Sequence, residues 1–299
     1  VHLLCSFCIM PFARGRIASR NEDEIAAEVK ALAENGVREV VINGIHLSSY
    51  GLERYSITEQ ASLRVNNGEL PLLPLIRRVA SVEGITRVRL GSLEPRVMTE
   101  EVVAELAKIP KLCPQFHLSL QSGCDETLRA MNRHYTTAEY NEVVKRLRKH
   151  FPDPAITTDI IAGFPQETEE QFEKTVAYVR EIGFAQVHVF PYSRRKGTVA
   201  DRMSGQLTEA VKKQRAAAIA EAAKGTLTEF RKRRIGQNAQ VLFEEEATID
   251  GRSYYVGFSR EYVPYAICSR TDLSGLEVTV RGLSMLPDGT MLSQETVDI

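Results

Sequence analysis

Residues 156–190 read ITTDIIAGFPQETEEQFEKTVAYVREIGFAQVHVF, and this stretch decides the fold. Its two ends, Ile156–Ile161 and Ala185–Phe190, are short runs rich in β-branched and aromatic residues, which predict strands. Between them Thr168–Ile182 has a helical pattern that opens with the capping box Thr168-Glu-Glu-Gln171 and is followed by a glycine. Two strands separated by one helix at this spacing predict a βαβ unit and therefore a parallel sheet.

The same alternation extends toward the N-terminus. It predicts strands at Arg38–Asn43, Thr86–Leu90 and Phe116–Leu120, and helices at Asn21–Asn35 (with Asn21 as N-cap), Thr99–Lys108 and Thr136–His150. The polar stretch Arg54–Gly68 is predicted to be a loop. Repeated units of this kind form a parallel sheet or an α/β barrel.

The pattern changes near the C-terminus. Residues Leu207–Arg234, rich in Ala, Lys and Glu, predict one long helix. After Ile235 only short strands follow, with glycine turns at Asp250-Gly251 and Asp288-Gly289, and these predict a small β-barrel. We therefore expect a first domain at 1–206, a connecting helix at 207–234 and a barrel at 235–299.

The composition excludes several protein classes. The 299 residues are 43% hydrophobic and 26% charged, with a formal net charge of -1, which suits a globular core rather than disorder. No apolar run reaches the length of a membrane helix, and no signal peptide opens the chain. Five cysteines with one close pair do not make a secreted disulfide framework, so we expect a cytoplasmic protein.

The near-neutral charge conceals two unlike parts. Residues 235–299 carry a net charge of -6, and residues 1–234 a net charge of +5. The negatively charged phosphates of a nucleic-acid partner would therefore bind residues 1–234 more favourably than residues 235–299. The basic run Arg231–Arg234 is open to two interpretations, a solvated helix end or an RNA-contacting patch. The aromatic residues Tyr254, Tyr255, Phe258 and Tyr262 could stack on bases or form the core of the barrel.

The close cysteine pair is Cys5-Ser-Phe-Cys8. By itself this spacing fits zinc, a redox pair or an iron–sulfur cluster. The remaining three, Cys113, Cys124 and Cys268, do not repeat the spacing and are interpreted as structural thiols.

A longer pattern surrounds the pair. The stretch Leu4–Arg20 resembles the cluster loop of the radical S-adenosylmethionine methylthiotransferase family. Further segments agree in order and spacing: Asn43–Gly51, Gly91–Pro95, Leu118–Gly123, Thr158–Thr168 and His188–Thr198. The C-terminal residues resemble a TRAM domain, the small RNA-binding barrel that closes these enzymes. The resemblance covers essentially the whole chain and implies a partial, open radical-SAM β/α barrel followed by a small all-β TRAM-type barrel.

The resemblance also implies the chemistry. Three thiolates would hold a 4Fe–4S cluster whose fourth iron binds S-adenosylmethionine, and electron transfer would cleave that cofactor. The segment Gly44-Ile-His-Leu-Ser-Ser-Tyr-Gly51 resembles the branch that acts on N6-threonylcarbamoyladenosine in tRNA, where the isopentenyl-adenosine branch carries a Gly-Gln-Asn type sequence. The alternatives are a ribosomal-protein aspartate methylthiotransferase and a non-catalytic RNA-binding paralogue. Expected partners are tRNA and an electron donor such as flavodoxin or ferredoxin, with no membrane and no DNA.

Site residues follow from the same resemblance. They are Cys5 and Cys8 as cluster ligands, Phe7 near the adenine, Glu94 and Gln121 at the ribose or methionine, Ile161 and Gly163 beside the nucleoside, and Arg194 at the methionine carboxylate. Simpler interpretations exist for three of them: Glu94 as a turn residue, Gln121 as a partner of loop backbone, and Gly163 as part of a βα turn.

The match departs from the family at the start of the chain. The first cysteine of the CxxxCxxC motif should stand four positions before Cys5, where the sequence has Val1. The first barrel strand and the preceding domain, which would bind a second 4Fe–4S cluster, also have no counterpart. We expect a fragment rather than a degenerate paralogue, and a chain that is inactive or severely impaired as written.

Overall fold

The computed structural model describes residues 5–55 and 70–296. Its first layer is a parallel sheet made of β1 (Glu39–Ile42), β2 (Arg87–Leu90), β3 (Gln115–His117), β4 (Ala155–Ala162) and β5 (Gln186–Pro191). Strand β1 pairs with β2, and β3 pairs with β4 and β4 with β5, all in parallel. Parallel bridges from Val88 to Leu112 and from Leu93 to Leu118 join the two groups. The five predicted strands are confirmed, and they follow one another in chain order as an open barrel requires.

Helices alternate with these strands. They are α1 (Met10–Arg14), α2 (Glu22–Glu34), α4 (Leu72–Ser81), α5 (Glu100–Ala107), α6 (Asp125–Ala130), α7 (Thr137–His150), α8 (Glu169–Ile182) and α9 (Glu209–Lys232). The Asn21 side chain accepts a hydrogen bond from the Asp23 amide, and Thr168 and Gln171 form the predicted capping box. The sequence analysis did not predict α4, although its buried leucines lie at helical spacing.

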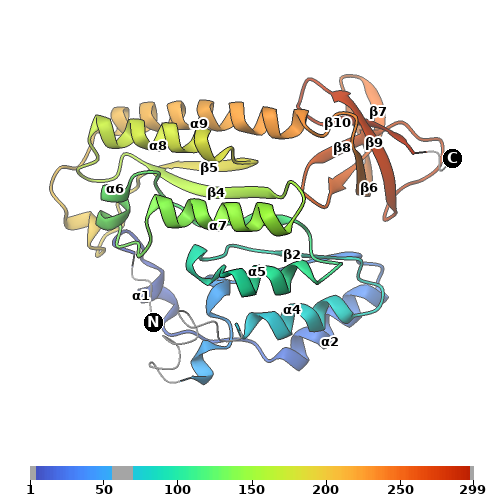
Figure 1. The fold of residues 1–299 in the computed structure, drawn as a ribbon, viewed down its shortest axis with the longest axis horizontal. Helices are drawn as coiled ribbons and strands as arrows, with labels where there is room; N and C mark the ends of the chain where they lie inside the picture. Colours follow the sequence, from blue (N-terminus) through green and yellow to red (C-terminus); the bar gives the residue numbers. More distant parts are fainter. Residues whose placement is uncertain (1–4, 56–69, 297–299) are drawn as a thin grey trace.

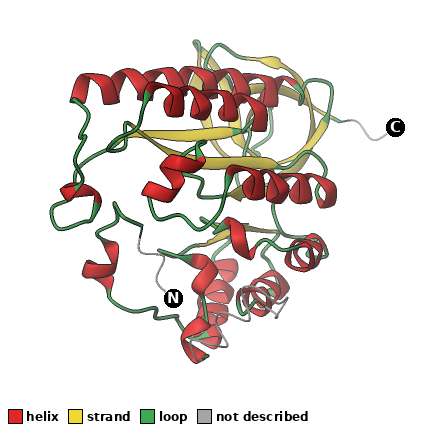
Figure 2. Cartoon of the chain, turned by 60° about the vertical axis from the view of Figure 1, so that its left-hand side comes forward, coloured by secondary structure: helices red, strands yellow, loops and turns green. Residues whose placement is uncertain are grey.

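The two faces of the sheet have different surroundings. On β4, Ile156 and Ile160 are buried in the main hydrophobic core together with helix residues such as Leu147 and Val179. Residues of the opposite parity, which include Asp159, point to the other face because side chains alternate along a strand. We call that second face the inner face of the sheet. Figure 2 shows the long helix α9 and its neighbour α8 beside the two longest strands of the sheet.

A closed barrel follows α9. It consists of β6 (Asn238–Ile249), β7 (Arg252–Ser259), β8 (Pro264–Ile267), β9 (Glu277–Met285) and β10 (Met291–Glu295), in the order β10-β8-β7-β6-β9. Asp250 and Gly251 have φ values of 50° and 76° in the turn between β6 and β7, as a tight hairpin requires. The prediction of a small all-β barrel after Ile235 is confirmed.

The barrel packs against the ends where the sheet strands begin. The fully buried Arg87 guanidinium donates to the carbonyl oxygens of Phe258 and Gln240, both at 2.8 Å, and to Glu277 Oε1 at 2.9 Å. Arg260 donates to the Leu112 carbonyl just before β3 at 2.9 Å. Figure 1 shows the barrel at one end of the sheet, with α1 and α6 at the opposite end.

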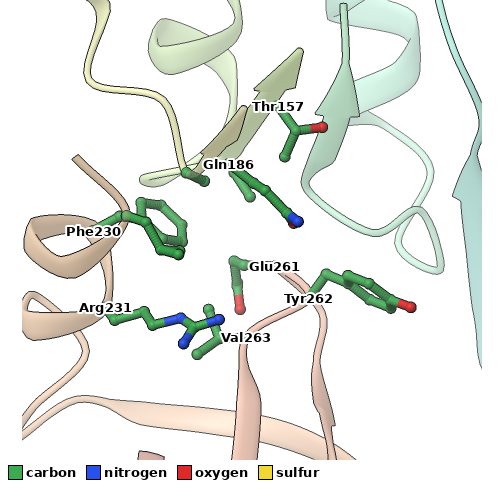
Figure 3. Close-up of a pocket in the computed structure, with 10 residues that line it drawn as sticks. Thr157, Gln186, Phe230, Arg231, Glu261, Tyr262 and Val263 are labelled. Carbon is green, nitrogen blue, oxygen red and sulfur yellow. The ribbon is translucent and has the colours of Figure 1, made fainter. Parts of the chain in front are cut away.

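A small pocket lies at this junction. Thr157 and Gln186 line it from the sheet, Phe230 from α9, and Glu261 and Tyr262 from the barrel. Figure 3 shows these side chains converging from the three parts. The pocket therefore belongs to the contact between sheet and barrel, at the end remote from α1.

None of the helices in the described part of the chain has the length and apolar character that crossing a membrane requires.

Candidate functional site

The segment with the two cysteines is fixed at the edge where the sheet strands end. The Ser6 amide donates to the Met131 carbonyl at 3.0 Å, and its hydroxyl donates to the Ala130 carbonyl at 2.8 Å. On the other side the Ala200 amide donates to the Ser6 carbonyl at 2.8 Å. Ser6 is thus held between the end of α6 and the loop after β5. In α/β barrels this edge is where catalytic residues gather.

The two cysteines form one turn. The Cys8 amide donates to the Cys5 carbonyl at 3.0 Å, and both side chains are partly buried free thiols. Arg133 Nη1 lies 3.3 Å from Cys5 Sγ. Burial raises the pKa of the Cys5 thiol above its ordinary value, and the Arg133 charge offsets only part of this rise. The turn thus presents two sulfur ligands beside a buried cation.

Arg133 is the centre of a buried polar network. Its Nη2 donates to Glu94 Oε2 at 2.8 Å, and its Nε donates to the Tyr135 hydroxyl at 2.9 Å. The side chains of Arg133 and Glu94 are only 5% and 6% exposed. The Tyr135 oxygen in turn lies 2.8 Å from the Leu120 carbonyl. The network joins the loops that follow β2 and β3 to the cysteine turn and fixes their relative positions.

The segment Gly44–Gly51 lies directly beside this network. Its short helix Leu47–Ser49 is buried, and Ser48 Oγ accepts a hydrogen bond from the Glu94 amide at 2.9 Å. The segment on which the predicted choice between branches rests is therefore next to a predicted site residue.

An apolar wall lies next to the cysteine turn. The ring of Phe7 meets Phe164 edge-on, with 6.4 Å between centroids, and Phe164 meets Tyr192 at 5.3 Å. Ile161 and Met131 belong to the same cluster. Phe7 and Ile161, predicted separately, are thus brought together, and the roles assigned to them toward a nucleoside stay predictions.

Two further predicted residues occupy special backbone positions. Gln121 and Gly163 have φ values of 76° and 73°. Gln121 bridges to β4 through its backbone, and a Cβ on Gly163 would lie 2.6 Å from Lys212 Cγ on α9. The close approach of α9 is sufficient to require glycine at 163. Contacts of either residue with a nucleoside stay predictions.

Arg194 also lies at the edge where the strands end, and its side chain pairs with another residue of this chain. Its Nε donates to Asp201 Oδ1 at 2.9 Å, and the side chain is 57% exposed. Its predicted contact with a methionine carboxylate is not tested by this arrangement.

Arg133 and Tyr135 are not among the residues predicted from the sequence. They follow α6 in a stretch without periodicity, and Arg133 contacts a cysteine 128 positions away in the chain. No spacing rule links residues so far apart. The one available signal was their proximity to the quoted segment Leu118–Gly123.

The arginines of the basic run at the end of α9 make hydrogen bonds and ion pairs with other residues of this chain. Arg233 Nη2 donates to Asp153 Oδ1 at 3.0 Å, Arg234 also pairs with Asp153, and Arg231 Nη1 donates to the Gly289 carbonyl at 2.9 Å. These contacts connect α9 to the sheet and to the barrel. Of the two interpretations of the run, the contacts favour a structural role.

The aromatic residues of the barrel also make internal contacts. Tyr254 is buried, and Phe258 stacks on Tyr262 with 4.6 Å between centroids. The Arg89 guanidinium of β2 lies 4.7 Å from the Tyr262 ring. Burial favours the packing interpretation for Tyr254, whereas Tyr262 is 50% exposed and its stack with Phe258 lies outside the barrel core, so base stacking by these two stays a prediction.

The donors at the cysteine turn fit an iron–sulfur cluster. Thiolates are the ligands that such clusters use, and the neighbouring Arg133 compensates negative charge. Cys5 and Cys8 offer two free thiols of this kind, and their role as cluster ligands stays a prediction. The cysteine turn therefore matches an iron–sulfur cluster in the type of its ligand atoms and in the charge beside them.

Comparisons with known proteins agree with this geometry. A family model described as the Radical SAM superfamily matches residues 2–179. A tRNA-2-methylthio-N(6)-dimethylallyladenosine synthase from Caldicellulosiruptor saccharolyticus is 38% identical over 240 residues, which is 80% of this chain and 48% of the relative. The synthase of the same name from Maricaulis maris is 39% identical over 248 residues, which is 83% of this chain and 53% of the relative.

The chain thus spans about half the length of these curated relatives. Among solved structures, the radical S-adenosylmethionine methyltransferase TsrM from Kitasatospora setae superposes with a TM-score of 0.51 at 18% identity, covering 66% of this chain and 36% of TsrM. That likeness concerns the fold alone. With the family match over more than half of its length, the chain belongs to the radical SAM superfamily.

Proposed function

We propose that this chain is the radical SAM part of a tRNA methylthiotransferase that adds a methylthio group to C2 of N6-threonylcarbamoyladenosine next to the anticodon. One observation carries the proposal: the Cys5/Cys8 turn, fixed at the strand-end edge beside Arg133, in a chain similar over four fifths of its length to tRNA methylthiotransferases.

The proposal gives roles to the two cysteines, Arg133, Glu94 and Phe7. Cys5 and Cys8 provide thiolate ligands of a 4Fe–4S cluster. When bound, the cluster supplies the electron that cleaves S-adenosylmethionine. Arg133 balances the negative charge of the thiolates, and Glu94 holds Arg133 in place. Phe7 belongs to the apolar wall that excludes water from the edge.

The substrate choice within the proposal rests on the segment Gly44–Gly51, whose sequence resembles the threonylcarbamoyladenosine branch and which contacts Glu94 through Ser48. The names of the similar synthases favour a second candidate, dimethylallyladenosine. The partners would be tRNA and an electron donor such as flavodoxin or ferredoxin, in the cytoplasm.

Mass spectrometry of tRNA nucleosides tests the proposal. A strain that lacks the gene should lose 2-methylthio-N6-threonylcarbamoyladenosine and accumulate the form without the methylthio group. Complementation with the intact gene should restore the modification, and genes carrying Cys5→Ala or Cys8→Ala should not. Cys268→Ala is the matched control, because this cysteine is exposed in the barrel.

Two results would contradict the proposal. Loss of the methylthio group from dimethylallyladenosine alone would identify the second candidate as the substrate. Full restoration of the methylthio modification by the Cys5→Ala gene would show that the reaction does not need the Cys5 thiol.

A further inference from the structure

Three polar side chains meet on the inner face of the sheet, outside the network around Arg133. His117 comes from β3, Asp159 from β4 and His188 from β5, and one ligand atom of each lies within 4.8 Å of the others. His117 Nε2 is 3.3 Å from Asp159 Oδ2, and the two imidazole centroids are 6.0 Å apart. Three adjacent strands therefore bring together residues that are far apart in sequence. We call them the His–Asp–His cluster.

Neighbouring polar groups orient His117, the least exposed member of this cluster. Gln115 Nε2 donates to Thr157 Oγ1 at 3.3 Å, and the same oxygen lies 3.0 Å from His117 Nδ1. The contact with Thr157 holds the His117 ring so that Nε2 faces Asp159. The orientation of His117 toward Asp159 is thus fixed by its neighbours.

The other members remain accessible. The Asp159 side chain is 31% exposed, and His188 is exposed. Within the described residues the His188 imidazole makes no hydrogen bond, and its ring contact with His117 leaves both ring nitrogens available. One imidazole and part of one carboxylate can therefore bind a ligand from the open side of the sheet.

The cluster has a defined position relative to the cysteine turn. Asp159 precedes Ile161 by two residues on β4, and His188 precedes Phe190 by two residues on β5. Both pairs point to the inner face, so the polar residues lie about 7 Å nearer the start of the strands than the apolar ones. Ile161 belongs to the apolar cluster that includes Phe7, and Phe190 is 52% exposed. A polar layer thus lies directly below the apolar layer at the site edge.

We propose that the His–Asp–His cluster binds the polar, carboxylate-bearing N6 substituent of the target nucleoside and thereby selects it. The inference rests on the proposed function and deepens it. A threonylcarbamoyl group offers carbonyl and carboxylate oxygens to the imidazole N–H groups, and a hydroxyl and an amide N–H to Asp159. A dimethylallyl group offers neither donor nor acceptor. It would desolvate these side chains without replacing their hydrogen bonds to water.

Binding of modified RNA to the 299-residue chain tests this inference without requiring a cluster or turnover. Fluorescence anisotropy would measure Kd for anticodon stem-loop RNAs that carry N6-threonylcarbamoyladenosine, N6-dimethylallyladenosine or plain adenosine at the same position. We expect the threonylcarbamoyl RNA to bind most tightly. His188→Ala and Asp159→Asn should each weaken its binding about tenfold or more, the usual effect of losing a hydrogen bond to a charged group, and leave the adenosine RNA unchanged.

Gln186→Ala is the matched control. Gln186 is exposed on the same face of β5, two residues before His188, and lies outside the cluster. It should leave the preference intact.

The outcomes separate the inference from the proposed function. A wild-type preference for the threonylcarbamoyl RNA that persists in both variants would overturn the inference and leave the proposed function standing. Equal binding of the three RNAs by the wild-type chain would overturn the substrate assignment and the inference together. Stoichiometric Zn²⁺ binding that is lost in both variants would overturn it in favour of a metal site.

Discussion

Replacement of Arg133 by methionine tests the structural argument for the site. The change keeps an unbranched, apolar side chain of similar length and removes the guanidinium. It takes away the hydrogen bond to Glu94 at 2.8 Å, the one to Tyr135 at 2.9 Å and the contact with Cys5 Sγ at 3.3 Å. A single substitution therefore disconnects the three segments that the network joins.

The magnitude follows from burial. The side chains of Arg133 and Glu94 are 5% and 6% exposed, so little water can replace the lost cation. Removing one partner of a buried ion pair costs about 3–5 kcal/mol of unfolding free energy. Adding Glu94→Gln should return part of this loss, because a neutral amide does not need a cation beside it.

Arg194→Met is the matched control. Arg194 also pairs with a carboxylate at the same edge, Asp201, at nearly the same distance of 2.9 Å. Its side chain is 57% exposed, and exposed pairs contribute about 0–1 kcal/mol. Urea unfolding, followed by circular dichroism, measures both variants on one scale. The two ion pairs have nearly the same length but differ in burial. A difference in unfolding free energy between the two variants is therefore due to burial.

Equal losses in the two variants would refute the reasoning. So would a loss below about 1 kcal/mol for Arg133→Met, the value typical of an exposed pair. Either result would mean that solvent reaches the network around Arg133.

Two further predictions concern the framework of the site. Gly163→Ala should destabilise the chain by about 1–3 kcal/mol in urea unfolding, because the new methyl group meets Lys212 at 2.6 Å and φ is 73°; Gly183→Ala, with φ of 66° and open space around it, should cost less. Burial raises the pKa of Asp153, but the hydrogen bonds and charges of Arg233 and Arg234 together outweigh it, and the pKa lies below its ordinary value. This contribution to stability is present above the unfolded-state pKa and is lost as the pH falls through the folded-state pKa, so Asp153→Asn should flatten the acid limb of a stability–pH profile. An unchanged acid limb would contradict it.

The resemblance to known proteins and the local patterns predicted different parts of the molecule. Strand and helix positions were predictable because β-branched runs, caps and glycine stops act over a few residues, as the capping box at Thr168 and Gln171 illustrates. Helix α4 escaped this reasoning, although its buried face is continuous. The cysteine turn and Glu94 were found through motifs, which give residue types and spacing without their contacts.

The sequence by itself determined the order of the five sheet strands, the change to a small barrel after Ile235, and the pair Cys5 and Cys8. These depend on neighbouring residues and on short spacings. Only the tertiary structure decided that Arg133 joins Cys5 to Glu94, and that His117, Asp159 and His188 meet on one face. The physical reason is that a parallel sheet pairs residues from strands separated by whole helices, and the register of that pairing is set by packing of the entire core.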